Sequence, residues 1–438
     1  MAEELPLEDS FSIDLQWPEK PGKGGNLLLD ESLARFQILV GGKSITAYQT
    51  ENGDTNSYLH VPAYYFVEWL SLNWWSFLYE PRKTDREDDY DFRSRHWIGM
   101  ARNGFALPDV LFSPVGNNID IAARPATLRF ARLGFTESIT TRIATENVRS
   151  EFSKFINQVL TRLKEKGIKD SEAHDAWAQV TMTSKEEEDY CRLIGSMGLS
   201  PYVEHPDVDR TIEEIQEKIS QTMLLDLCEA TSSGNVKAVA AVTHQASQSL
   251  ARAKPVKVTE LLKAEKPPDN SAHAYEWGYS SAATARQALG IAADDPSGAT
   301  AFFDKLKLDV GIETTSEVAN STVISGAEER ENEDMRLSIV GSNIPNRKFA
   351  AARAAFLAWS RAEKSSRLVT TARTRDQQAS RAFAAELLVP EKYLHKKLGA
   401  KTEVSRSELD KLSEAMGVSP PVVHYQARNH GYYIAEAA

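Results

Sequence analysis

The sequence has few cysteines and no long apolar run. Its 438 residues include 2 cysteines, Cys191 and Cys228, and their positions fit neither a paired metal motif nor a disulfide framework. We therefore expect two free thiols in a reducing compartment. No stretch of about 18 apolar residues is present, as a membrane span would need. The first ten residues, MAEELPLEDS, lack the charged and apolar regions of a secretory signal. These absences predict a cytoplasmic protein without a membrane partner.

Excess positive charge is also missing. Lys and Arg number 51 against 62 Asp and Glu, a formal net charge of −11, which argues against bulk binding of nucleic acid but allows a local basic patch. The glycine-rich stretch 22–25 has neither the spacing of a P-loop nor a strand–helix junction. The composition, 42% hydrophobic and 26% charged, is ordinary for globular proteins. The length suggests about two to three domains.

The first 140 residues predict a β-rich domain that contains one aromatic helix. Alternating apolar stretches on either side of residues 41–42 and 116–118 are typical of β-hairpins. Between them, segment 59–80 carries eight aromatic residues at helical spacing, which favours a buried helix over a ligand groove or a membrane-surface element. The same domain holds a conceivable acid–base set, although lone polar residues near strand ends are usually structural: Arg95, His96 and Asp109.

Residues 141–253 predict a helical region. An apolar residue recurs every three or four positions from Val148 to Leu163, as on the buried face of a helix. Ser184 and Glu187 have the spacing of a capping box, which marks the start of another helix. The mixture of proline and charge in residues 254–272 indicates an interdomain linker.

Two consecutive helices are predicted in the C-terminal part, residues 273–438. The first begins near Arg347, is rich in alanine, and places Phe349, Phe356 and Trp359 on one face. The second ends in FAAELLVP, where Pro390 stops it. Further along, LSEAMGVSPPVVHYQARNHG (412–431) has the pattern of two short helices around a turn.

These motifs, in this order, resemble the core of the ImmA/IrrE-like metallopeptidases. The helix that opens at about His273 and the strand and turn at 335–348 are also similar to that family. The resemblance covers residues 273–438 and implies a zincin-like domain, in which a small sheet packs on two core helices. The predicted fold class is therefore α+β: a β-rich and helical N-terminal domain followed by a zincin-like C-terminal domain.

The metal-binding part of the family motif is altered here. In the family, two histidines at i and i+4 of the first core helix bind zinc, and the Glu beside the first activates water. The resemblance places Arg353 and Ala354 at the first His and the Glu, and Leu357 at the second His. At the start of the second helix, where the family has a third ligand, Asp376 is the carboxylate. Because a permanent cation repels zinc and neither Ala nor Leu binds metal, we expect neither a cofactor nor catalysis.

The altered pocket is nonetheless basic. Residues 347–381 contain nine Lys and Arg but two carboxylates. The simplest interpretation is helix ends and loop surface. Alternatively, Arg353, Arg347 and Arg381 form an anion site for a carboxylate or phosphate, or the cleft contacts nucleic acid. A salt bridge from Arg353 to Asp376 across the two helices would neutralise the former metal position.

Two functions from different classes follow. Active family members are zinc peptidases, and some cleave repressors that control phage, mobile-element or stress genes. The favoured hypothesis is therefore a catalytically inactive relative that binds a protein partner, such as a repressor, in bacterial stress response or defence against mobile elements. The alternative is a zinc metallo-endopeptidase with displaced ligands, which would come from five residues: His395, His424, His430, Glu386 and Asp376.

Overall fold

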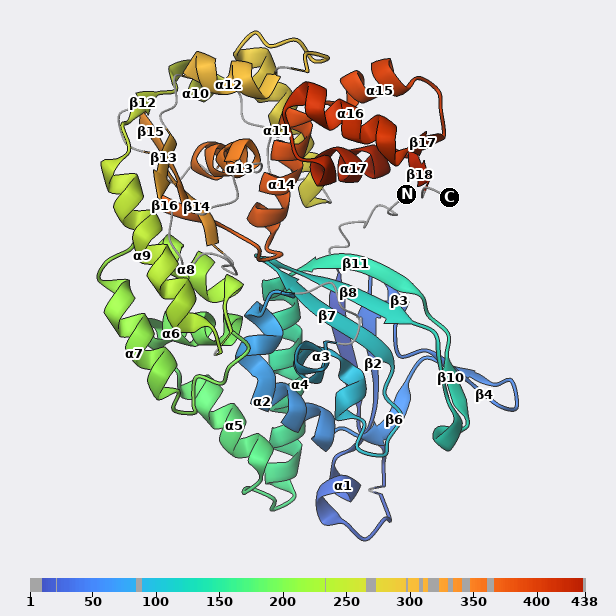
Figure 1. Cartoon of the computed structure of the whole chain (residues 1–438). Helices are drawn as coiled ribbons and strands as arrows, with labels where there is room; N and C mark the ends of the chain where they lie inside the picture. Colours follow the sequence, from blue (N-terminus) through green and yellow to red (C-terminus); the bar gives the residue numbers. More distant parts are fainter. Residues whose placement is uncertain are drawn as a thin grey trace. The chain divides into compact units, whose positions relative to one another are not determined.

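The computed structural model describes eleven stretches of the chain, which fall into two compact units (Figure 1). The division lies between Glu204 and His205. Both units contain helices and strands, which confirms the predicted α+β class. The described residues are 10–20, 22–83, 89–232, 234–264, 273–296, 298–306, 310–313, 323–329, 334–340, 347–360 and 366–435.

The N-terminal unit contains three small antiparallel sheets. In the first, β2 pairs with β1, β3 and β6; the second has the order β5-β4-β10-β9 and the third β11-β8-β7. The strands are β1 (Phe11–Gln16), β2 (Leu33–Val40), β3 (Lys43–Ser44), β4 (Tyr48–Thr50), β5 (Thr55–Asn56), β6 (Leu59–Pro62), β7 (Asp109–Val115), β8 (Asn118–Arg124), β9 (Ala126–Leu128), β10 (Leu133–Phe135) and β11 (Ile139–Ala144). The helices are α1 (Leu27–Glu31), α2 (Tyr64–Tyr79), α3 (Tyr90–His96), α4 (Thr145–Glu165), α5 (Glu172–Met182) and α6 (Lys185–Ser196), with two 3-10 turns, η1 (Ile98–Ala101) and η2 (Arg129–Ala131).

Both predicted hairpins are present. Gly41 and Gly42 turn the chain between β2 and β3 with φ of 56° and 77°, a backbone conformation that glycine adopts without steric cost. Gly116, with φ of 68°, begins the turn between β7 and β8. The capping box of Ser184 and Glu187 starts α6 as predicted.

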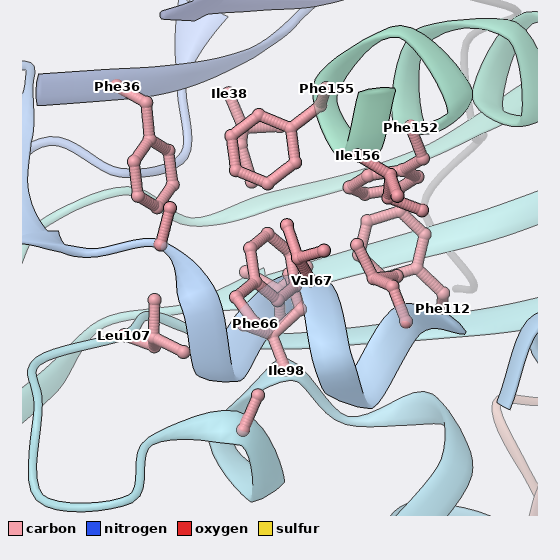
Figure 2. Close-up of a cluster of buried hydrophobic side chains, with 14 of the residues drawn as sticks. Phe36, Ile38, Phe66, Val67, Ile98, Leu107, Phe112, Phe152, Phe155 and Ile156 are labelled. Carbon is pink, nitrogen blue, oxygen red and sulfur yellow. The ribbon is translucent and has the colours of Figure 1, made fainter. Parts of the chain in front are cut away.

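The aromatic helix α2 lies in the core of the N-terminal unit, which confirms the structural interpretation of its aromatic residues. The ring centroid of Phe66 is 5.7 Å from that of Phe155 on α4 and 6.2 Å from that of Phe36 on β2. Phe112 on β7 and Phe152 on α4 complete the cluster, with centroids 5.7 Å apart (Figure 2). These rings join sheet and helices into one apolar core, and such aromatic pairs contribute beyond their buried area.

The C-terminal unit is built on one five-stranded sheet. Its order is β12-β15-β14-β16, and β13 pairs in parallel with β15. The strands are β12 (Val256–Lys257), β13 (Val310–Glu313), β14 (Val323–Glu329), β15 (Asp334–Val340), β16 (Ser366–Thr370) and a separate pair, β17 (Glu403–Ser405) and β18 (Tyr433–Ala435). The helices are α7 (Pro206–Gln216), α8 (Gln221–Ala230), α9 (Val236–Arg252), α10 (Thr259–Lys263), α11 (Ala274–Ala288), α12 (Gly298–Leu306), α13 (Arg347–Ser360), α14 (Arg375–Leu388), α15 (Glu391–Leu398), α16 (Arg406–Met416) and α17 (Pro420–Asn429).

The unit boundary differs from the predicted domain limits. The predicted helical region 141–253 is divided, because α4 to α6 belong to the N-terminal unit and α7 to α9 to the C-terminal unit. Part of the predicted linker 254–272 is β12, which pairs with β15, and residues 265–272 lie outside the described residues. An apolar stripe marks the face that a helix buries, but it does not indicate which sheet receives that face. No helix among the described residues has the length and apolar character to cross a membrane.

One close helix contact in the C-terminal unit involves a glycine. A Cβ atom on Gly278 of α11 would lie 2.4 Å from the carbonyl oxygen of Ala379 and 2.7 Å from Cβ of Ala382, both on α14. The two backbones therefore approach at a distance that only glycine allows. This contact holds α14, which carries much of the candidate site described below, against α11.

We expect Gly278→Ala to lower the free energy of unfolding of the C-terminal unit by about 1–3 kcal/mol, because the added methyl group overlaps backbone atoms that cannot move freely. Urea unfolding followed by circular dichroism measures the change. The control is Ala283→Ser on the exposed face of α11, which should leave the unfolding midpoint almost unchanged. Equal midpoints for the two variants would contradict the close contact.

Candidate buried arginine site

The residues that the sequence resemblance aligns with a zinc site lie on α13, in the core of the C-terminal unit. Arg353, Ala354 and Leu357 are 3%, 0% and 2% exposed. The small alanine side chains of α13 allow its close packing against β14, β16 and α14. Arg353 is therefore a cation enclosed in protein, and a buried charge requires hydrogen-bond partners.

Arg353 binds three neutral acceptors. Its Nε donates to Ser380 Oγ at 3.0 Å, and its Nη2 donates to the carbonyl oxygen of Thr370 at 2.8 Å and to Gln377 Oε1 at 2.9 Å. No described carboxylate forms an ion pair with it. The predicted salt bridge between Arg353 and Asp376 is thus wrong: Asp376 Oδ2 accepts instead from Arg367 Nη1 at 2.9 Å.

Gln377 connects Arg353 to the neighbouring strand. Its Oε1 accepts from Arg353 and from the backbone N–H of Thr370 at 3.0 Å, while its Nε2 donates to the carbonyl oxygen of Leu368 at 2.7 Å. The amide side chain therefore mimics a neighbouring strand beside β16. Gln377 is fully buried, so every one of these bonds replaces a bond to water that folding removed.

A buried carboxylate from a distant part of the chain completes the network. Asp226 on α8 accepts from Arg367 Nε at 2.8 Å and Nη2 at 2.9 Å, and from the backbone N–H of Leu368 at 2.9 Å. Its Oδ1 also lies 3.5 Å from Gln377 Nε2. We call this set the Arg353 network: Asp226, Arg353, Arg367, Thr370, Asp376, Gln377 and Ser380.

The two arginines of the network differ in their electrostatic surroundings. Burial lowers the pKa of Arg353 well below its ordinary value, and the nearby Arg381 lowers it further. For Arg367, burial acts in the same direction, but Asp226 and Asp376 outweigh it and raise the pKa well above its ordinary value. Since arginine stays protonated in proteins, Arg353 is a poorly compensated cation and a divalent metal beside it would be strongly repelled.

The three arginines of the predicted anion site do not share one role. Arg381 donates from Nη1 to the carbonyl oxygen of Ala372 and from Nη2 to that of Thr371, each at 3.0 Å. It therefore lies at the loop that follows Thr370, and Arg353 binds the carbonyl oxygen of Thr370 itself. Arg347 is the first residue of α13. It is six residues from Arg353, or about 9 Å along the helix. Arg353 and Arg381 thus flank the end of β16, while Arg347 lies apart from them.

The displaced-ligand hypothesis named five residues, and the structure brings three of them together. His430 Nε2 lies 3.7 Å from Glu386 and its Nδ1 3.5 Å from Glu391, which also lies 3.3 Å from His395 Nε2. His424 instead contacts Asp410 at 2.9 Å, away from this cluster. Among the described residues, no group of three or more His, Cys, Asp or Glu is placed so that it could hold a metal ion.

The conceivable acid–base set of the N-terminal unit forms a different arrangement. Arg95 Nε and Nη2 donate to Glu80 at 2.7 and 2.8 Å, and His96 Nε2 lies 3.1 Å from the same carboxylate. Asp109 is not part of it and accepts from Trp97 Nε1 at 2.6 Å. Burial would raise the pKa of Glu80, but Arg95 and His96 outweigh it and lower the pKa to about 2. Burial also lowers the pKa of His96, which is 0% exposed.

Sequence reasoning missed the residues that bind Arg353. Gln377 and Ser380 are three apart on α14 and thus share one face, a signal that was available in the sequence. Asp226 precedes Arg367 by 141 residues, and no local pattern connects them. No family model, no curated protein and no solved structure matches this chain. Its function must therefore be inferred from the geometry itself.

We expect Asp226→Asn to lower the free energy of unfolding of the C-terminal unit by about 3 kcal/mol or more, because it leaves Arg367 partly uncompensated and places an amide N–H against a guanidinium. Urea unfolding measures the loss. Asp207→Asn on α7 is the control: Asp207 also pairs with an arginine, but its side chain is 74% exposed, so the midpoint should stay unchanged. Equal effects would show that Asp226 makes no special contribution.

We expect the N-terminal unit to lose stability as the pH falls below about 6.5, the ordinary pKa of histidine in an unfolded chain. Because the pKa of buried His96 is lowered, the unfolded chain binds one more proton in this range. Glu80 does not contribute in this pH range. The stability that its lowered pKa provides is complete above pH 4.5 and is lost as the pH falls towards about 2. His96→Gln, whose amide can still donate to Glu80, should reduce the pH slope by about 1.4 kcal/mol per pH unit.

Urea unfolding followed by tryptophan fluorescence between about pH 7 and pH 5 measures this slope, since six of the eight tryptophans precede residue 205. His60→Gln, at an exposed histidine of the same unit, is the control and should keep the slope of the unaltered protein. Parallel curves for His96→Gln and the unaltered protein would contradict the neutral, buried state of His96.

Proposed function

We propose that this chain is a catalytically inactive, peptidase-like protein that works by binding a regulatory protein partner in the bacterial cytoplasm. Its C-terminal unit would have a zincin-like fold of the ImmA/IrrE type without the zinc. The packing of α13 on β14, β15 and β16, and of α14 on α13, is compatible with that fold. The proposed setting, stress response or defence against phage and other mobile elements, rests on the sequence resemblance alone.

The Arg353 network is the observation that carries this proposal. A zinc peptidase needs two or three ligands around an open coordination position. At the aligned positions, Arg353 donates hydrogen bonds to Thr370, Gln377 and Ser380. Leu357 packs in the apolar core. Hydrogen bonds and apolar contacts thus join α13 to α14, and this packing needs no metal. A cation at this place supports a protein without the zinc chemistry of the active family members, because it would repel a metal ion.

The alternative, a zinc endopeptidase with non-standard ligands, has one favourable observation. His395, His430, Glu386 and Glu391 lie within 4 Å of one another in consecutive pairs. However, these groups already satisfy one another and their neighbours: His395 Nδ1 lies 2.7 Å from the Tyr432 hydroxyl, and Gln426 Nε2 donates to Glu386 at 2.7 Å. We therefore interpret this cluster as a structural connection between α14, α15 and α17.

We expect the protein purified without chelator to carry about 0.1 zinc ions per chain or fewer, and we expect neither chelator nor added zinc to shift its thermal midpoint, because a bound metal would stabilise the folded state. Elemental analysis and thermal unfolding measure both quantities. His395→Ala is the matched variant and should behave identically. Stoichiometric zinc that is lost with chelator, or in His395→Ala, together with peptide cleavage by the metal-loaded protein, would overturn the proposal in favour of the endopeptidase.

A further inference from the structure

Strand β6 of the N-terminal unit has one edge without a strand partner among the described residues. It pairs with β2 over Leu59–Pro62, and neighbouring residues of an antiparallel strand direct their backbone groups to opposite sides. Ala63 continues this register, since its N–H donates to the carbonyl oxygen of Ser32 at 2.9 Å. The backbone N–H and C=O groups of Leu59 and Val61 therefore point towards β2, while those of His60 point away from it.

The position of proline in this strand agrees with that assignment. Pro62 has no N–H, and proline is tolerated in a strand where the missing donor would point away from the neighbouring strand. Within the part of the chain that the structure describes, no backbone group binds the outward N–H or C=O of His60. Such an edge is a template for another extended segment.

The open edge of β6 lies beside an apolar groove of about 270 Å³. One wall is β6 itself, and the others come from β4, β10, η2 and the turn at 104–106. Gly104 lies in this turn with φ of +89°, a conformation that favours glycine. Because glycine has no side chain, this wall leaves the groove open. Phe130 of η2 lines the groove and is 61% exposed. A large aromatic ring so exposed beside a free strand edge is typical of an interaction surface.

The charge around the groove selects among extended ligands. Arg129 and Arg132 are exposed and flank Phe130 in the sequence. Glu51, whose N–H donates to the carbonyl oxygen of Arg132, and Asp54 are exposed in the turn after β4. The two arginines beside the exposed ring favour acidic side chains in the part of a ligand that meets Phe130, because arginine binds carboxylates in a bidentate manner.

We propose that this groove binds an extended, acidic peptide segment of a partner protein, which adds a strand to the open edge of β6. Backbone bonds to His60 would hold the segment, as in other cases of strand addition. Side chains alternate along a strand, so apolar residues would enter the groove beside Phe130 and Leu133 while acidic residues meet the arginines. The proposal goes beyond the regulatory role inferred above, and it involves the other unit, so the zinc measurement does not decide it.

The probe is a fluorescein-labelled peptide pool, Glu-Φ-Glu-Φ-Glu-Φ-Glu-amide, in which Φ is an equimolar mixture of valine, leucine, phenylalanine and tyrosine. Anisotropy titration against the full chain should detect binding in the micromolar range, about 1–100 μM. The same pool with Lys in place of Glu should bind at least about tenfold more weakly. Hydrogen exchange should show new protection at Leu59–Pro62 when the acidic pool is present.

Three variants identify the groove. We expect Phe130→Ser and the pair Arg129→Glu with Arg132→Glu each to weaken binding about tenfold, and His60→Pro, which removes the outward N–H, to weaken it about fivefold. Tyr90→Ser is the matched control, because Tyr90 is an exposed aromatic residue of the same unit, 69% exposed, that does not line the groove. It should bind like the unaltered protein.

Any of three results would overturn the proposal. The first is the absence of binding and of protection at Leu59–Pro62 at about 1 mM of the acidic pool, well above the weakest affinity expected for strand addition. The second is binding that Phe130→Ser and Tyr90→Ser weaken equally. The third is competition by a single-stranded thymidine oligomer that binds with higher affinity than the peptide pool. The last outcome would assign the groove to nucleic acid instead of peptide.

Discussion

The C-terminal unit is organised around a buried cation, Arg353, that forms no ion pair with a carboxylate among the described residues. Arg353 is enclosed between α13, β16 and α14, and a charge in such surroundings is tolerated only when its donors are used. Gln377 provides the main acceptor, and it is in turn fixed by β16 and lies next to Asp226. One polar network thus connects four elements, α8, β16, α13 and α14. Because its members come from distant parts of the chain, it forms only when the whole unit is folded.

If the proposed relationship to zinc peptidases holds, this network would replace the metal. In an active zinc enzyme of this type, the ion holds two helices in a fixed relation and supplies folding energy through its ligands. The guanidinium of Arg353 connects α13 to α14 through Ser380 and Gln377. A hydrogen-bonded side chain can provide the same geometric constraint as a metal, but it cannot provide the Lewis acidity that activates water.

The N-terminal unit follows a different principle, with an apolar aromatic core and its polar groups at the margin. Glu80, Arg95 and His96 form a buried group at the end of α2, while the open edge of β6 and the groove beside it leave backbone and aromatic surface accessible. The unit thus combines an apolar interior with an accessible strand edge at β6. Such a combination suits recognition of an extended partner, since the scaffold contributes no ordering cost when the partner binds.

The sequence by itself determined the features that depend on neighbours in the chain: the hairpins at Gly41–Gly42 and Gly116, the buried aromatic helix, the capping box of α6 and the α+β class. It also indicated that Arg353 and Leu357 share one face of α13. Only the tertiary structure decided what Arg353 binds, that Arg367 and not Arg353 pairs with Asp376, and how the helices are divided at Glu204. The reason is physical. Local sequence patterns determine periodicity and turns. The partner of a buried charge, such as Asp226 for Arg367, lies 141 residues away and meets it only when the chain folds.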